Sequence, residues 1–239
     1  MDLKEQEILS GQADNHWYYV SKGRALCSFI AGVDVPEILD VGAGSGVFAR
    51  RMLVNGVSAR AVCVDPNYSR EWDEQCHGKP IQFRRALAEV TQRLILMIDV
   101  LEHVDDDLVL VSSYMNEAPS GTLLLISVPA FEFLWSGHDV FLEHKRRYTL
   151  PKVESLVRRT GLEVVRGRYF FASLFPLVAL MRLHDRWRLA AGRMPKSALT
   201  RHSVWVNDLL RRLHYLEQVT LFRINRVAGV SVFCLARKP

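Results

Sequence analysis

The sequence EILDVGAGSGVFA at residues 37–49 is an apolar run that leads into a glycine-rich turn and then into a helical pattern. Gly42 and Gly44 let the backbone turn sharply and approach a ligand without a Cβ clash. Gly46 opens the following helix, whose N-terminal amides favour polar or negatively charged ligand atoms. Nicotinamide and flavin sites also use glycine turns, but the spacing here is G-x-G-x-G rather than G-x-G-x-x-G. The stretch therefore predicts a cofactor seated on a strand–turn–helix unit.

Short apolar runs alternate with helical patterns around this turn, which is typical of βαβ units and a parallel sheet. The runs are almost continuously hydrophobic, so helices should cover both faces of the sheet. With 49% hydrophobic residues the chain can bury a substantial core. We expect one domain over residues 1–239, of the α/β class, with a doubly wound, mostly parallel, Rossmann-like sheet of seven strands. The expected strands are 38–41, 61–65, 81–84, 94–99, 122–128, 163–169 and 231–237. The expected helices are 18–31, 46–55, 68–77, 105–117 and 151–160.

Residues 170–228 are rich in Leu, Arg and Trp and predict a helical insert before the last strand. Its first twelve residues carry no charge, but a bilayer span takes roughly 20 apolar residues. Apolar residues then recur at helical spacing at Val206, Leu209, Leu210, Leu213 and Leu216. An Arg-rich amphipathic insert can lie on a membrane or hold a lipid-linked substrate. The alternative is the inner face of a lid or of a dimer helix, so both a monomer and a homodimer stay open.

Charge is unevenly distributed along the chain. Residues 1–130 carry 11 Lys and Arg against 18 Asp and Glu, whereas residues 131–239 carry 20 against 8. Sixteen of the latter cations are Arg, which suits bidentate contacts with phosphate or carboxylate. The basic part predicts an anionic partner, namely a phosphorylated substrate, a membrane surface or nucleic acid, unless it is only a solvated basic face.

Cysteine usage and the first residues bear on the compartment. The four cysteines form no CxxC pair, which predicts reduced, mostly packing thiols in an intracellular protein. The first ten residues carry four charges, unlike a secretory leader. We therefore expect a cytoplasmic protein, with contact at the periphery of a membrane as a further option.

Two strand ends carry acids. Asp65 ends the second expected strand, 19 residues beyond Gly46, where an acid can accept hydrogen bonds from both ribose hydroxyls. A surface Asp that caps the next helix is the alternative. The run LILMIDVLEHV at residues 94–104 predicts a buried strand that ends at Asp99 and is followed by Glu102 and His103.

Together, ILDVGAGSG, the strand-end Asp65, DVLEHV and the later PSGTLLLISVP resemble the class I S-adenosylmethionine-dependent methyltransferase family, and above all its branch of ubiquinone-type O-methyltransferases. The resemblance covers residues 16–170 and the final strand. It implies S-adenosyl-L-methionine as cofactor and S-adenosyl-L-homocysteine as product. The cofactor residues that it implies on the sheet side are Asp40, Gly42, Ala43, Gly44, Asp65, Pro66, Ala86, Leu87, Asp99 and Val100. The acidic residue usual in the loop at Ala86 is missing here. The motif around Tyr18 and Arg24 resembles a family lid over the cofactor carboxylate, within an N-terminal helical segment at residues 1–31.

Glu102 and His103 leave three roles open. Some relatives with an acid-x-x-Glu-His sequence at this strand end bind a divalent metal there, and the resemblance then implies Asp99, Glu102 and His103 with His138 or His144. The second role is acid–base chemistry by Glu102, His103 or His144, because the pKa of histidine lies near neutral pH. The third is a structural role, with Glu102 and His103 bonded to the loop at residues 130–148.

That loop follows an expected strand and must lie at the carboxyl ends of the strands, where open α/β sheets bind ligands. We expect the loop to contain about twenty residues and no helix or strand, and loops of this length usually have a function. The candidate substrate residues are Trp135, His138, Asp139, Arg147 and Tyr148.

The sequence thus predicts methyl transfer to an oxygen or nitrogen atom of a small or lipid-linked, anionic acceptor. One alternative is an RNA methyltransferase, which the basic part favours, although the sequence contains no separate RNA-binding module. The other is a non-catalytic cofactor-binding scaffold that docks on a membrane or a partner, because a fold does not fix a function.

Overall fold

The computed structural model describes residues 15–190 and 202–239. Eight strands form one sheet in the order β3-β4-β2-β1-β5-β6-β8-β7. The first four are β1 (Val35–Val41), β2 (Ser58–Val64), β3 (Trp72–Cys76) and β4 (Lys79–Arg84). The others are β5 (Leu94–Ile98), β6 (Leu123–Pro129), β7 (Glu163–Phe170) and β8 (Ser231–Arg237). Strands β4, β2, β1, β5 and β6 run parallel, whereas β3, β7 and β8 make the antiparallel pairs.

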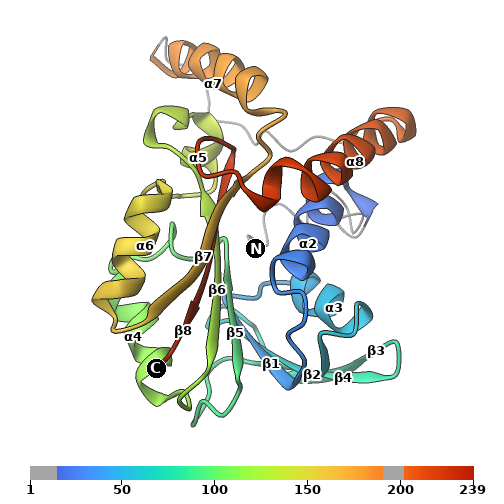
Figure 1. Ribbon diagram of the computed structural model, residues 1–239, viewed down its shortest axis with the longest axis vertical. Helices are drawn as coiled ribbons and strands as arrows, with labels where there is room; N and C mark the ends of the chain where they lie inside the picture. The colour runs from blue at the N-terminus through green and yellow to red at the C-terminus, as the bar shows by residue number, and fades with distance from the viewer. Residues whose placement is uncertain (1–14, 191–201) are drawn as a thin grey trace.

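Helices cover both faces of this sheet (Figure 1), as the continuous hydrophobic strands predicted. On one face lie α2 (Trp17–Phe29) and α3 (Val47–Val54), packed with Phe170 and Phe233 into one buried cluster. On the other face lie α4 (Asp107–Glu117) and α6 (Leu150–Arg159), packed over β5, β6 and β8. The predicted doubly wound α/β class is confirmed.

The sheet has eight strands rather than seven, because the predicted helix at residues 68–77 is wrong. The segment instead forms β3, which pairs antiparallel with β4. His77 and Gly78 both have positive φ and make the two-residue turn of a hairpin. Trp72 stacks on Phe83 with ring centroids 4.2 Å apart. Burial alternates along β3 with period two, but the inward positions include the charged Glu74, so the sequence shows no apolar alternation there.

The segment between β6 and α6 also differs from the expected loop, because it contains two short helices. These are the 3-10 helix η2 (Glu132–Leu134) and α5 (Gly137–Phe141). Ser136 and Asp139 form a reciprocal capping box at the start of α5. The Ser-x-x-Asp spacing was therefore a helix-start signal inside the expected loop.

The predicted insert contains α7 (Phe175–Ala190), α8 (Val204–Val219) and the 3-10 helix η3 (Leu221–Arg223). Helix α8 packs on α2, and α7 contacts η2 and α5. Residues 191–201 of the predicted insert lie outside the described residues, and so do residues 1–14 of the predicted N-terminal segment. Within the described part of the chain, no helix is long and apolar enough to cross a bilayer. All four cysteines are free.

Candidate active site

A cavity of about 920 Å³ opens at the carboxyl ends of β1, β2 and β5. The glycine turn after β1 forms one wall, and Gly42, Gly44 and Gly46 all have positive φ. A Cβ at Gly42 would lie 2.6 Å from a methyl of Val100, which lines the same cavity. Both the backbone conformation and the close approach therefore require glycine here.

Most of the predicted cofactor residues meet at this cavity. Those that line it are Gly42, Asp65, Pro66, Ala86, Leu87, Asp99 and Val100. Asp40, Ala43 and Gly44 lie in or beneath the turn and are outside the lining. Further walls come from α4 and from residues 142–145. Sequence reasoning missed these residues because only the folding of the chain brings them to the cavity. Those missed residues include Leu110, Ser113, Tyr114, Leu142, Glu143 and Lys145.

Asp65 fixes the shape of the glycine turn as well as lining the cavity. Its Oδ2 accepts a hydrogen bond from the Gly44 N–H at 3.1 Å, and its Oδ1 accepts one from the Asn67 N–H at 2.9 Å. The hydroxyl of Tyr68 donates to the Gly44 carbonyl at 2.6 Å. Each carboxylate oxygen keeps a lone pair for a ligand hydroxyl, since a carboxylate offers about four acceptor positions.

Asp40 lies buried at the end of β1 beneath the turn. Burial raises the pKa of its carboxyl from 3.8 to about 7. A hydrogen bond from the Ala49 backbone lowers this pKa, and the nearby Asp65 carboxylate raises it. A group with this pKa changes charge near neutral pH. A cation bound nearby would favour its ionised form.

Lys22 on α2 is the main polar residue that the sequence analysis missed. Its ammonium group is fully buried and lies 2.6 and 2.5 Å from the two carboxylate oxygens of Asp99. The hydroxyl of Tyr18 completes the group, because it accepts from Lys22 at 3.2 Å and donates to Asp99 at 3.4 Å. Lys22 shares a helix face with the buried Tyr19 and Leu26. A lone charge on an apolar face was therefore the available signal.

The structure brings Tyr18 to Asp99, but it does not bring Arg24 to the cavity. Arg24 is exposed and lines a separate hollow with Tyr215 and Gln218. The cation that α2 contributes beside Asp99 is Lys22 rather than Arg24.

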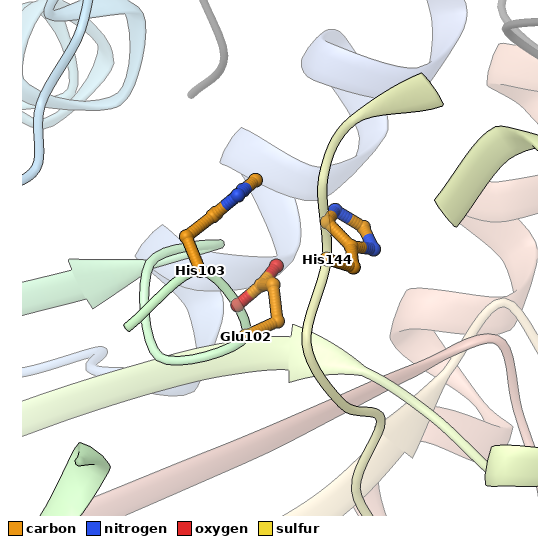
Figure 2. Close-up of side chains that lie close together, drawn as sticks. All are labelled: Glu102, His103 and His144. Atoms are coloured by element: carbon orange, nitrogen blue, oxygen red, sulfur yellow. The ribbon is translucent and has the colours of Figure 1, made fainter. Parts of the chain in front are cut away.

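Glu102, His103 and His144 come together beside the cavity (Figure 2), with one ligand atom from each lying within 4.8 Å of the others. Glu102 and His103 follow β5, and His144 follows α5. The two imidazole rings meet edge to face with centroids 4.7 Å apart. His103 lines the cavity, whereas Glu102 and His144 stand outside its lining.

Glu102 is almost fully buried, and its Oε2 has no hydrogen-bond partner among the described residues. Burial, reinforced by the Asp99 carboxylate, raises the pKa of Glu102 well above its ordinary value. The protonated acid is therefore favoured, and such a group can donate a hydrogen bond to a ligand or a water molecule.

Asp139 orients His144. Its Oδ1 lies 2.9 Å from His144 Nδ1 and accepts from Arg147 Nε at 2.7 Å, and its Oδ2 accepts from the Ser136 N–H at 2.9 Å. Burial opposes ionisation of Asp139, but the hydrogen bond from His144 and the Arg147 guanidinium outweigh it and hold the pKa of this carboxyl below its ordinary value. An ionised Asp139 can only accept, so the Nδ1 atom of His144 carries a proton and donates it to this carboxylate.

The predicted substrate residues do not line the cavity. Asp139 and Arg147 are buried against each other, and the hydroxyl of Tyr148 bonds to Asp107 at 2.8 Å and to the Leu101 carbonyl at 3.0 Å. Trp135 and His138 are half-buried on either side of Ser136. Asp139, Arg147 and Tyr148 are thus tied into the framework, and Trp135 and His138 lie outside the cavity lining.

A protein-family profile described as a methyltransferase domain matches residues 16–166, which is more than half of the chain. The chain belongs to the methyltransferase domain family. The protein is therefore a class I S-adenosylmethionine-dependent methyltransferase, as its motifs predicted. Among curated proteins, none matches the sequence.

Solved structures show the same fold at low identity. A Haloferax volcanii protein described as a methyltransferase, solved with the Trm112 methyltransferase activator, is 14% identical, with 96% of this chain and 93% of that chain covered and a TM-score of 0.58. Phosphoethanolamine N-methyltransferase 2 of Haemonchus contortus, solved with phosphomonomethylethanolamine and S-adenosylhomocysteine, is 14% identical, with coverages of 90% and 52% and a TM-score of 0.51. The cyclase SpnF is 12% identical, with coverages of 92% and 80% and a TM-score of 0.55. Because one of these neighbours is a cyclase, the likeness shows the fold and leaves the acceptor open.

The methyltransferase's cavity fits its cofactor. The cavity is within the range of about 300–1,000 Å³ typical of small-molecule sites. The turn at Gly42 leaves no room for a Cβ, and Asp65 offers free acceptor positions beside it. S-adenosylmethionine is the cofactor of this protein.

Proposed function

We propose that this methyltransferase acts on an oxygen or nitrogen atom of a small or lipid-linked, anionic acceptor, with His103 as proton acceptor. The observation that carries the proposal is the position of His103. It lines the cavity in common with the cofactor residues Asp99 and Val100, and it belongs to the cluster with Glu102 and His144.

The methyl donor, when bound, supplies an electrophilic methyl group on sulfur. The strand-end walls at Gly42, Asp65 and Val100 hold it in place, and catalysis comes mainly from fixing donor and acceptor in a near-attack geometry. The bond from sulfur to the methyl carbon breaks as the acceptor atom bonds to that carbon. S-adenosylhomocysteine leaves as the product, and the proton of the acceptor passes to His103.

Asp139 and His144 fix the surroundings of His103. The rings of His103 and His144 are 4.7 Å apart, and Asp139 lies 2.9 Å from the Nδ1 atom of His144. Asp139 is therefore a positioning residue for this pair, and Glu102, in its protonated form, donates rather than competes for the proton.

The anionic character of the acceptor rests on charge. Arg85 and Lys145 line the cavity, with Lys145 also paired with the exposed Asp105, and residues 131–239 carry 20 Lys and Arg against 8 Asp and Glu. The phosphorylated acceptor in the Haemonchus contortus structure belongs to that protein. It is one example of an anionic molecule held by this fold, and a cytoplasmic location of the present protein fits such an acceptor.

The cofactor site is tested by calorimetric titration of S-adenosylmethionine into wild type and Asp65→Ala. Losing hydrogen bonds to a charged group costs about 1.5–3 kcal/mol, so we expect affinity to fall tenfold to a hundredfold. Asp73→Ala is the matched control, because Asp73 is an exposed acid on β3 paired with Arg84. Equal affinities for wild type and Asp65→Ala would contradict the assignment of Asp65.

The catalytic role is tested by His103→Ala. Removal of a general base lowers the rate about 10²- to 10⁴-fold, while affinity for S-adenosylmethionine should stay within a few-fold of wild type. Transfer of labelled methyl groups into cell extract, separated into lipid, RNA and small-molecule fractions, finds the acceptor and provides the assay. Label in the RNA fraction would instead support an RNA methyltransferase. Unchanged transfer by His103→Ala would remove the proposed base.

A divalent metal is the alternative occupant of this cluster. The predicted ligand set included Asp99, but Lys22 pairs with its carboxylate, so Glu102, His103 and His144 remain as the ligands within reach. Carboxylate and imidazole ligands suit several first-row metals, and Asp139 would orient His144 equally well for this role. Metal analysis of purified wild type and His144→Ala separates the roles, because stoichiometric metal lost only in the variant would favour the metal site.

A further inference from the structure

The two helices of the insert turn apolar side chains outward. On α7, Leu177, Leu180 and Trp187 follow one another at helical spacing and are all more than half exposed. The opposite face of α7 carries Arg182, which is buried and donates a hydrogen bond to the Ser136 hydroxyl. Apolar residues on the free face and a buried arginine on the docked face reverse the usual pattern of a surface helix.

Helix α8 repeats this reversal. Its inner face carries His214 and Glu217, both buried, with Glu217 accepting from the Ala172 N–H at 2.6 Å. Its outer face carries Trp205, which is 88% exposed, together with Leu209 and Leu216. Both helices lie at one end of the molecule (Figure 1). Helix α5, which follows β6 in the chain, lies at the same end.

Cations accompany these apolar faces. Residues 175–190 and 204–226 carry seven arginines and three acidic residues, one of which is the buried Glu217. Arg212 lies between Leu209 and Leu216 on α8, and Arg223 lies in η3. Both are exposed and have no ion-pair partner among the described residues. Exposed Trp and Leu beside unpaired Arg match a surface that is apolar at its centre and anionic at its boundary.

We propose that the outer faces of α7 and α8 dock this methyltransferase on an anionic membrane surface. Trp187 and Trp205 enter the headgroup boundary with the neighbouring leucines, and Arg212 and Arg223 contact lipid phosphates. A second copy of the chain fits less well, because residues 175–190 and 204–226 offer its arginines only two acidic residues besides the buried Glu217. Nucleic acid would leave the leucines unburied. The docking does not depend on which acceptor is methylated.

The docked end is continuous with the candidate site. Arg182 of α7 bonds to Ser136, which begins α5, and Asp139 of α5 holds His144. The docked end is therefore connected to His144 by side-chain contacts, although Ser136 and Asp139 do not line the cavity.

The test is co-sedimentation of the full chain with two kinds of vesicle, phosphatidylcholine alone and phosphatidylcholine mixed with phosphatidylglycerol. We expect binding to the mixed vesicles that weakens as salt is added. Replacing both tryptophans, Trp187→Ser with Trp205→Ser, should lower binding more than tenfold. Arg212→Gln with Arg223→Gln should lower binding to the mixed vesicles about 25-fold, at about fivefold per arginine, while leaving the weaker binding to phosphatidylcholine unchanged.

The control variant is Val54→Ser with Val109→Ser, which removes exposed apolar side chains outside the insert and should bind vesicles as wild type does. Circular dichroism melts and titration with S-adenosylmethionine verify that each variant is folded. Absence of vesicle binding by the folded wild type overturns the proposal, as does equal binding by the tryptophan variant. Sedimentation velocity provides the other decisive outcome, because a wild-type dimer that the tryptophan variant converts to monomer would assign the surface to a second copy. The vesicle test uses no methyl transfer, so its failure is distinguishable from failure of the proposed reaction.

Discussion

The glycine turn after β1 and the segment from η2 to Tyr148 meet at the same edge of the sheet, but different interactions hold them in place. The turn depends on backbone geometry, because Gly42 must have a positive φ and leave room for Val100. The segment depends on buried side-chain pairs, above all Asp139 with Arg147 and His144. The turn is thus held by backbone geometry, and the segment is held by buried charged side chains that pair with one another.

This difference indicates how each side tolerates change. Removal of the Asp65 carboxylate costs the turn its hydrogen bonds from the Gly44 and Asn67 N–H groups, but it leaves no buried counter-charge without a partner among the described residues. A segment held by a buried ion pair cannot lose one partner without leaving the other charge uncompensated. The predictions below test this contrast.

The largest effect is expected from Asp139→Ala. It leaves the Arg147 guanidinium buried with only the Ala130 carbonyl as a remaining partner. Breaking one partner of a buried pair costs about 3–5 kcal/mol, so denaturant unfolding should show a loss of that size. Asp105→Ala, at an exposed acid paired with Lys145, is the control and should leave stability unchanged. Similar losses for both variants would show that the buried pair is not what holds the segment.

The next effect concerns Asp40 beneath the turn and depends on pH. In the folded protein the Asp40 pKa is about 7, against 3.8 when unperturbed, so the unfolded chain ionises first as the pH rises. The contribution of this group to the unfolding free energy therefore falls between about pH 4 and about pH 7. Relative to wild type, the unfolding free energy of Asp40→Asn should therefore rise by up to about 4 kcal/mol over that pH range.

Urea unfolding of the cofactor-free protein at several pH values measures this gain. Asp34→Asn, at an exposed acid before β1, is the control and should follow the wild-type profile. A constant difference between Asp40→Asn and wild type at all pH values would mean that Asp40 is ionised in the folded protein. The turn would then contain a structural charge, as the acceptor side does.

The smallest effect is expected from Arg182→Met. The substitution removes the hydrogen bond from α7 to Ser136 but keeps the Asp139 capping box and the apolar stem of the side chain. One hydrogen bond from a charged donor contributes about 1.5–3 kcal/mol, so the thermal midpoint should fall by about 3–12 °C. A loss as large as that of Asp139→Ala would place α7 within the same cooperative framework as the ion pair.

Sequence reasoning was most successful where local pattern and structure share one cause. Continuous apolar runs predicted the parallel strands, and the glycine spacing with Asp65 and Asp99 predicted the cofactor wall, because strand ends fall at one edge of a parallel sheet. It was wrong for β3, because three polar residues separate Trp72 from Cys76 and the strand is defined by its pairing with β4. It also missed α5, which is only five residues long.

The sequence by itself determined the fold class and the cofactor, and it predicted seven of the residues that line the cavity, since these follow from motifs within single strand–turn units. Tertiary structure alone decided the partners of the charged side chains. It pairs Lys22 with Asp99, which lies 77 residues away in the sequence, buries Arg147 on Asp139, and sets His144 beside His103. Whether a charged residue binds a ligand or supports the framework depends on which groups neutralise it after folding, because burial without a partner is too costly to persist.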